Sequence, residues 1–139
     1  MADSGYSGTP LWKKLGIREG ARVALLGAPE GAEALLEPLP DGVRLLRRVA
    51  PGLDVAVLFT DSAARLERRM PAVRAAMTPA GGLWVAWPKR SSGVPTDVTE
   101  DVVRDMGLAA GLVDNKVCAI DATWSGLRLV TRLADRPRG

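Results

Sequence analysis

The sequence contains no histidine and a single cysteine, Cys118, among its 139 residues. Without histidine, the chain excludes a Ser-His-Asp triad, a histidine general base and zinc sites built from cysteine and histidine. One cysteine also excludes a disulfide within the chain, and its place in the apolar run KVCAI favours a buried, inert thiol. Any chemistry must therefore use Asp, Glu, Lys, Tyr, Ser, Thr, the one cysteine or backbone amides.

The sequence also has no long apolar run, and we expect no leader segment. No stretch approaches the ~20 apolar residues needed to cross a bilayer, and the N-terminal MADSGYSGTP has no charged region followed by an apolar one. We therefore expect a cytoplasmic protein without a membrane partner. Arginines are scattered among acidic residues at a net charge of +3, and aromatics make up only 4%. A nucleic-acid surface is more continuously basic and carries interleaved aromatics, so we expect no nucleic-acid partner.

The length of 139 residues is typical of one domain. We expect a flexible N-terminus over residues 1–8, one domain over 9–133 and a flexible tail over 134–139. Continuous apolar runs between turn residues predict buried strands. The expected strands cover residues 22–27, 43–49, 53–60, 83–87, 115–120 and 127–133.

Helix signals separate most of these strands. The predicted helices are one that begins at Pro10 after a Thr9 cap, a short one over 30–37, one after Ser62 and one after a Thr99 cap. Pro71 lies inside the third helix, where we expect a kink or a break. Residues 78–82 (TPAGG) are expected to form a turn, and residues 121–126 (DATWSG) to connect a closing β-hairpin. This alternation predicts an α/β fold, a three-layer Rossmann-like sheet that is mostly parallel and has a C-terminal antiparallel hairpin strand.

The run from residue 53 to 133 resembles the carboxyl half of the class I S-adenosylmethionine methyltransferase fold. The matching pieces are LDVAVLFTD, a helix, TPAGG, LWVAW, a second helix and the final hairpin. The resemblance concerns topology, so it implies a methyltransferase-like, truncated fold and not an activity. In such enzymes a glycine-rich loop after the first strand and an acidic residue after the second strand hold the cofactor.

Both halves of that cofactor motif are altered here. The first loop reads Gly27-Ala28-Pro29-Glu30-Gly31, which lacks the dinucleotide spacing, and Glu30 would repel a phosphate at a helix N-terminus. The second strand ends in Arg47-Arg48, with no acid. We therefore expect no cofactor, and S-adenosylmethionine is the alternative that the fold leaves open.

Three segments are similar to a bacterial, actinobacterial-type family known only as a domain of unknown function. They are GYSGTPLWKKLGI, the WPK loop followed by SGVPTD, and KVCAIDATWSGL. This resemblance spans nearly the whole chain, and it implies a bacterial source but no activity, substrate or partner.

Ligands of doubly wound sheets bind beyond the carboxyl ends of the parallel strands. The predicted topology sends the loops 27–31, 60–61, 88–96 and 121–125 to that edge. We expect the ligand-binding residues among them and beside them: Gly27, Glu30, Asp61, Trp87, Lys89, Arg90, Ser91, Ser92, Asp121, Trp124 and Ser125.

The loop after strand 83–87 is the foremost candidate. Lys89 and Arg90 offer cationic donors, and Ser91, Ser92 and Gly93 offer hydroxyls and an amide to an anion. The competing interpretation is a solvated pair of charges beside a flexible loop. The same region raises two further alternatives. Its tryptophans either form an aromatic wall for a planar ligand or close the sheet edge by packing, and its loop carboxylates are either general bases or surface groups.

Two functions remain open. The first is a non-catalytic Rossmann-like module that binds a small anionic ligand or a protein partner at the carboxyl edge of the sheet. The alternative is a small methyltransferase-fold enzyme with a degenerate cofactor site, in which Asp or Lys serves as acid or base. The missing histidine, the lack of metal ligands and the altered first loop favour the first function, with no metal site expected.

Overall fold

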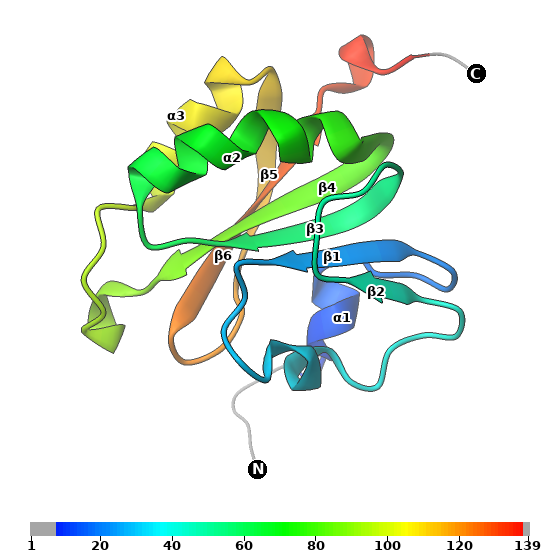
Figure 1. The fold of residues 1–139 in the computed structure, drawn as a ribbon, viewed down its shortest axis with the longest axis horizontal. Helices are drawn as coiled ribbons and strands as arrows, with labels where there is room; N and C mark the ends of the chain where they lie inside the picture. The colour runs from blue at the N-terminus through cyan, green and yellow to red at the C-terminus, as the bar shows by residue number, and fades with distance from the viewer. Residues whose placement is uncertain (1–7, 138–139) are drawn as a thin grey trace.

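The computed structural model describes residues 8–137, which fold into a six-stranded sheet with helices on both faces (Figure 1). The strands are β1 (Arg22–Leu26), β2 (Arg44–Leu46), β3 (Leu53–Phe59), β4 (Met77–Pro88), β5 (Leu112–Ala119) and β6 (Trp124–Thr131). The α-helices are α1 (Leu11–Lys14), α2 (Ala63–Ala76) and α3 (Glu100–Ala109), and the 3-10 helices are η1 (Ala32–Leu36), η2 (Arg90–Ser92) and η3 (Leu133–Asp135). The predicted α/β fold class is confirmed.

The sheet has the strand order β2-β1-β3-β4-β6-β5. Strands β2, β1, β3 and β4 are parallel, whereas β6 runs antiparallel to both of its neighbours. The continuous apolar runs of β1 and β3 place these strands inside the sheet, because both of their faces are covered. The arginine-bearing β2 lies at one edge, and the predicted closing β5–β6 hairpin forms the other side.

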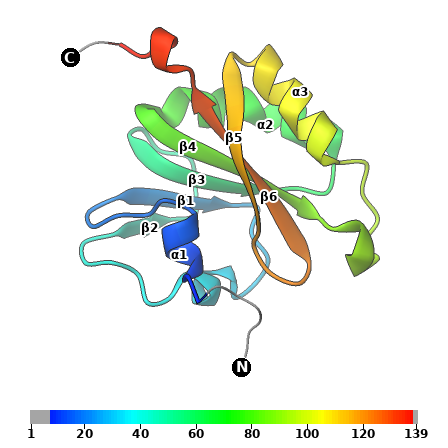
Figure 2. The same cartoon turned by 180° about the vertical axis from the view of Figure 1, so that it is seen from behind.

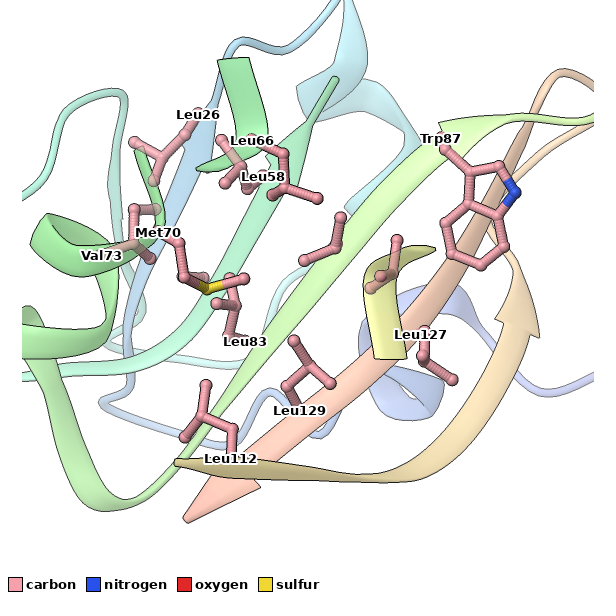
Figure 3. Packing of buried hydrophobic residues seen from close by; sticks show 14 of the residues in the cluster. Leu26, Leu58, Leu66, Met70, Val73, Leu83, Trp87, Leu112, Leu127 and Leu129 are labelled. Carbon is pink, nitrogen blue, oxygen red and sulfur yellow. The ribbon is translucent and has the colours of Figure 1, made fainter. Parts of the chain in front are cut away.

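The two faces of the sheet carry different helices and separate apolar clusters. Helices α2 and α3 cover one face through Leu66, Met70, Val73 and Val103, and Figure 3 shows part of this packing. Helix α1 and the η1 turn cover the other face, which Figure 2 shows from behind. Trp84 is fully buried on this second face, and its Nε1 donates to the carbonyl of Leu15 over 3.0 Å.

Helix α3 packs unusually close to β6 through Gly107. An added Cβ at Gly107 would lie 2.8 Å from Leu129 Cδ2 and 3.0 Å from Leu129 Cδ1. Leu129 is fully buried, so moving its side chain aside would disturb the packing around it. The glycine therefore sets the distance between the helix and the sheet, and with it the position of the chain that enters α3.

Two local predictions need correction. The expected break at Pro71 is wrong, because α2 continues from Ala63 to Ala76, whereas a kink there stays a prediction. The buried positions of α2, Leu66, Met70 and Val73, flank the proline on both sides, and their packing on the sheet offsets the missing hydrogen bond. Residues 78–82 form no separate turn but belong to β4, because pairing with β3 resumes after a bulge.

The ends of the chain and of several strands differ slightly from the expected bounds. Pro10 is the N-cap of α1 and the predicted Thr9 is not. Trp124 begins β6 and does not lie in the hairpin connection. The tail predicted to be flexible contains η3, and Arg136 Nε donates to the carbonyl of Thr131 over 3.0 Å. Residues 1–7 of the expected flexible N-terminus, and residues 138–139, lie outside the described part.

Candidate functional site

The four predicted loops do meet at the carboxyl edge of the parallel strands. Register places Leu26 beside Leu58, so Gly27 follows next to Phe59, and a Cβ on Gly27 would lie 2.8 Å from the Phe59 carbonyl oxygen. Gly27 also has a φ of +63°, a conformation that favours glycine. Both this backbone conformation and the close Phe59 carbonyl therefore require a glycine at position 27. The amide of Lys89 donates to the Thr123 carbonyl over 2.7 Å, which joins the β4 loop to the hairpin.

A hollow of about 550 Å³ lies at the end of β4, and we call it the β4 groove. It is lined by residues 87–90, 93–96, 98–100 and Ser125. Four of the predicted ligand-binding residues are among them: Trp87, Lys89, Arg90 and Ser125. Its volume lies within the roughly 300–1,000 Å³ of small-molecule sites.

Around the β4 groove, the acidic side chains have bonding partners and, within residues 8–137, the two basic ones that line it do not. Glu100 pairs with Arg104 over 2.5 Å, and this hydrogen bond and the one that Arg104 donates to Asp114 raise the pKa of Arg104. Asp97 Oδ1 accepts from the amide of Ala63 over 2.8 Å. Lys89 and Arg90 have no ion pair or side-chain hydrogen bond within residues 8–137. The groove therefore presents two free cations, while nearby acids already have partners.

The loop that forms the groove is held by its own polar side chains. Ser92 Oγ donates to the Lys89 carbonyl over 2.6 Å and accepts from the Val94 amide over 3.2 Å. Thr96 Oγ1 donates to the Asp61 carbonyl over 2.8 Å, and the Asp61 carboxylate pairs with Arg65. Ser92 and Asp61 thus shape the loop and its anchor point. Ser91 is exposed and does not line the groove.

The hairpin residues also have structural contacts. Asp121 Oδ1 accepts from the amides of Thr123 and Trp124, each over 2.8 Å, and closes the turn. Trp124 packs edge-on against Phe59, with ring centroids 5.0 Å apart. Trp124 belongs to the cluster on the α1 face and Trp87 to the cluster on the α2–α3 face. The two tryptophans therefore form no common aromatic wall, and only Trp87 faces the β4 groove.

Gly27 and Glu30 line a second, smaller hollow of about 250 Å³ after β1. This is where methyltransferases of the resembled fold hold their cofactor. Pro29 has no amide hydrogen to donate, and Glu33 forms an ion pair with Arg47 across the hollow. The volume is below the ~300 Å³ lower bound for small-molecule sites. The first loop and its hollow therefore differ from the glycine-rich cofactor loop of those enzymes.

Several lining residues were not predicted. Thr99 and Glu100 reach the β4 groove from the first turn of α3, and Glu33 and Arg47 close the β1 hollow. The capping signal places Thr99 beside the loop, but the sequence gives no sign that Glu33 meets Arg47. In residues 8–137, no group of three or more His, Cys, Asp or Glu side chains suits a metal ion. No helix in the same range is long and apolar enough to span a bilayer.

Solved structures share this arrangement of helices and strands. PhzM, a pyocyanin biosynthetic protein, is 15% identical with a TM-score of 0.65 over 88% of this chain and 53% of its own. A SAM-dependent methyltransferase from Aquifex aeolicus is 15% identical with a TM-score of 0.62 over 86% of each chain. LepI in complex with SAM is 12% identical with a TM-score of 0.56 over 89% of this chain. The fold is methyltransferase-like.

The present chain spans about half the length of LepI and of PhzM, at 47% and 53%. Identities this low show the fold alone. No family model and no curated protein sequence matches the chain. The expected membership of an actinobacterial-type family, the bacterial source and the cytoplasmic location therefore stay predictions. The named neighbours share the fold of the alternative function, a methyltransferase-fold enzyme.

Proposed function

We propose that this methyltransferase-like domain binds a small anionic molecule in the β4 groove. The observation that carries the proposal is the pair of cations, Lys89 and Arg90, which lack partners in residues 8–137 on the rim of a groove of about 550 Å³. Trp87 and Val98 supply an apolar floor, and Thr99 and Ser125 supply hydroxyls that can donate to an anion. A few polar groups over an apolar floor are typical of metabolite sites.

The loop is also held in shape before a ligand arrives. The hydrogen bonds of Ser92 and Thr96, and the Lys89–Thr123 backbone bond, fix its path at both ends. A binding loop that is ordered in advance loses less conformational entropy when it binds. This order supports a binding site over the competing interpretation of solvated charges beside a flexible loop.

The second candidate is a methyltransferase-fold enzyme that uses SAM. Its support is the likeness to solved structures named as a SAM-dependent methyltransferase and as a SAM complex. Against it stand the small β1 hollow and the Glu33–Arg47 pair that crosses it. Under this candidate SAM would have to open that pair or bind elsewhere at the edge.

Calorimetric titration distinguishes the two candidates. The panel contains nucleotides, di- and tricarboxylates, SAM and S-adenosylhomocysteine, all at fixed ionic strength. The test variant is Lys89→Ala/Arg90→Ala, and the matched control is Lys13→Ala/Arg68→Ala, which removes the same charge from exposed positions. Two charge-assisted contacts of about 1.5–3 kcal/mol each predict a loss of roughly 100-fold or more in affinity.

An anion that binds the wild type and the control but not the test variant supports the proposal. Binding of SAM that the test variant retains would replace it with the second candidate. If no compound binds, or if both double variants lose affinity equally, the β4 groove is not an anion site.

A further inference from the structure

A third hollow lies at the opposite, amino edge of the parallel strands and has no part in the function proposed above. Its volume is about 410 Å³, within the size range of small-molecule sites. It lies between the α1–β1 connection and the first residues of β3 and β4. The connection contributes Gly16, Arg18 and Gly20, and the two strands contribute Asp54 and Thr78. We call it the amino-edge hollow. Arg128 of β6 completes its wall.

Arg128 is the unusual member of this set. It is a half-buried guanidinium with no hydrogen bond or ion pair within residues 8–137. Burial lowers its pKa, and the charge of Arg136 lowers it further. A partly desolvated charge without a protein partner gains more from an oxyanion than a fully solvated charge does, so this guanidinium suits an occupant of opposite sign.

The surrounding backbone makes room for this guanidinium. Arg128 pairs with Trp84 across the β4–β6 ladder, and its side chain runs back along β4 to Gly82. A Cβ on Gly82 would lie 2.5 Å from Arg128 Nε and 3.0 Å from Nη2. Any larger residue at position 82 would displace the guanidinium, so the glycine keeps it at the hollow.

The charged groups near Arg128 do not neutralise it. Asp54 Oδ2 accepts from the Arg22 amide over 2.9 Å. Lys116, the β5 partner of Arg128, donates to the Lys14 carbonyl, and Arg136 donates to the Thr131 carbonyl. Arg18 adds another cation to the lining. The carboxylates of Glu19 and Asp54 also line the hollow, but neither forms an ion pair with Arg128. The fork of an arginine matches the two oxygens of a carboxylate or phosphate.

We infer that the amino-edge hollow is a second binding site, which takes a carboxylate or phosphate group of a small molecule on the guanidinium of Arg128. Thr78 offers a hydroxyl to the same ligand, and Asp54 and Glu19 offer carboxylates to any ammonium or hydroxyl groups it carries. This site is independent of the β4 groove, because the two hollows share no lining residue.

Amide resonances of the full chain test the inference with simple probes. Inorganic phosphate and acetate are titrated separately at constant ionic strength, with chloride as the balancing ion. The expected result is a saturable shift of the amides of Gly16, Gly20 and Gly81, which line the hollow. The stronger of the two probes identifies which oxyanion the site prefers.

Three variants locate the binding group. Arg128→Gln removes the charge and is expected to weaken binding about tenfold or more. Gly82→Ala keeps the charge but displaces the guanidinium, and it is expected to weaken binding severalfold, so the test does not depend on Arg128→Gln folding. Arg132→Gln removes one exposed charge from the same end of the chain and is expected to bind as the wild type does.

Two results would overturn the inference. One is a shift that never saturates, or that is equal in the wild type, Arg128→Gln and Gly82→Ala. The other is a saturable shift confined to Gly93 and Ser125, which would place the only anion site in the β4 groove and leave the proposed function standing.

Discussion

Replacing Gly107 by valine tests how strictly the α3–β6 contact positions the β4 groove. The first β-carbon alone would lie 2.8 Å and 3.0 Å from the two δ-carbons of Leu129, whereas carbon atoms prefer about 3.5–4.0 Å. Leu129 is fully buried, so relief requires α3 to move or Leu129 to leave its rotamer. Valine gains only a few tenths of a kcal/mol of helix propensity over glycine, against about 1–3 kcal/mol for overpacking a core.

We therefore expect Gly107→Val to lower the free energy of unfolding by about 2 kcal/mol. The measurement is urea unfolding followed by circular dichroism, with a fall in Tm of roughly 8 °C as the thermal counterpart. Ala109→Val is the control, because Ala109 is exposed on the same helix, and it should cost only about 0.5 kcal/mol.

The double variant Gly107→Val/Leu129→Ala decides the mechanism. Truncating Leu129 removes the colliding δ-carbons, so the two changes should be less than additive by about 1 kcal/mol or more. Strict additivity, or a Gly107→Val protein as stable as the wild type, would refute the claim that this contact fixes α3.

Three further predictions concern a buried indole, a helix cap and the thiol. Trp84→Phe removes the donor to the Leu15 carbonyl and should cost about 1–3 kcal/mol in urea unfolding. Thr99→Ala removes the bond accepted from the Val102 amide and should cost about 1 kcal/mol, with weaker anion binding in the β4 groove next to it. Cys118 is only partly buried, not fully as expected, and this partial burial raises its pKa. Its reaction with a disulfide reagent should therefore be slower in the folded protein than in urea at pH 8. Because the folded thiol holds its proton to higher pH than the unfolded one, the contribution of Cys118 to stability should be present below the unfolded pKa and be lost as pH rises past it.

The sequence predicted the sheet and its carboxyl edge well. The apolar runs of β1 and β3 can be buried only in a sheet covered on both faces, and the alternation with helices orders the strands. The loops after β1, β3, β4 and β5 therefore meet as expected, and Lys89 and Arg90 lie at that edge. The continuous course of α2 through Pro71 was not predictable from the local signal, because the packing of its flanking residues outweighs a missing bond.

Only the tertiary structure determined which side chains lie together around each hollow. The sequence predicts that Trp87 and Trp124 lie near the same edge of the sheet. The strand register places their side chains on opposite faces of the sheet. The Glu33–Arg47 pair joins elements whose separation along the chain hides their contact. In the sequence, Arg128 looks like any of the other scattered arginines. The antiparallel pairing of β4 and β6 places its guanidinium beside Gly82, where it has no partner within residues 8–137. Local patterns thus determined the elements and their edge, while contacts across the sheet, which depend on register and face, determined the hollows and their charge.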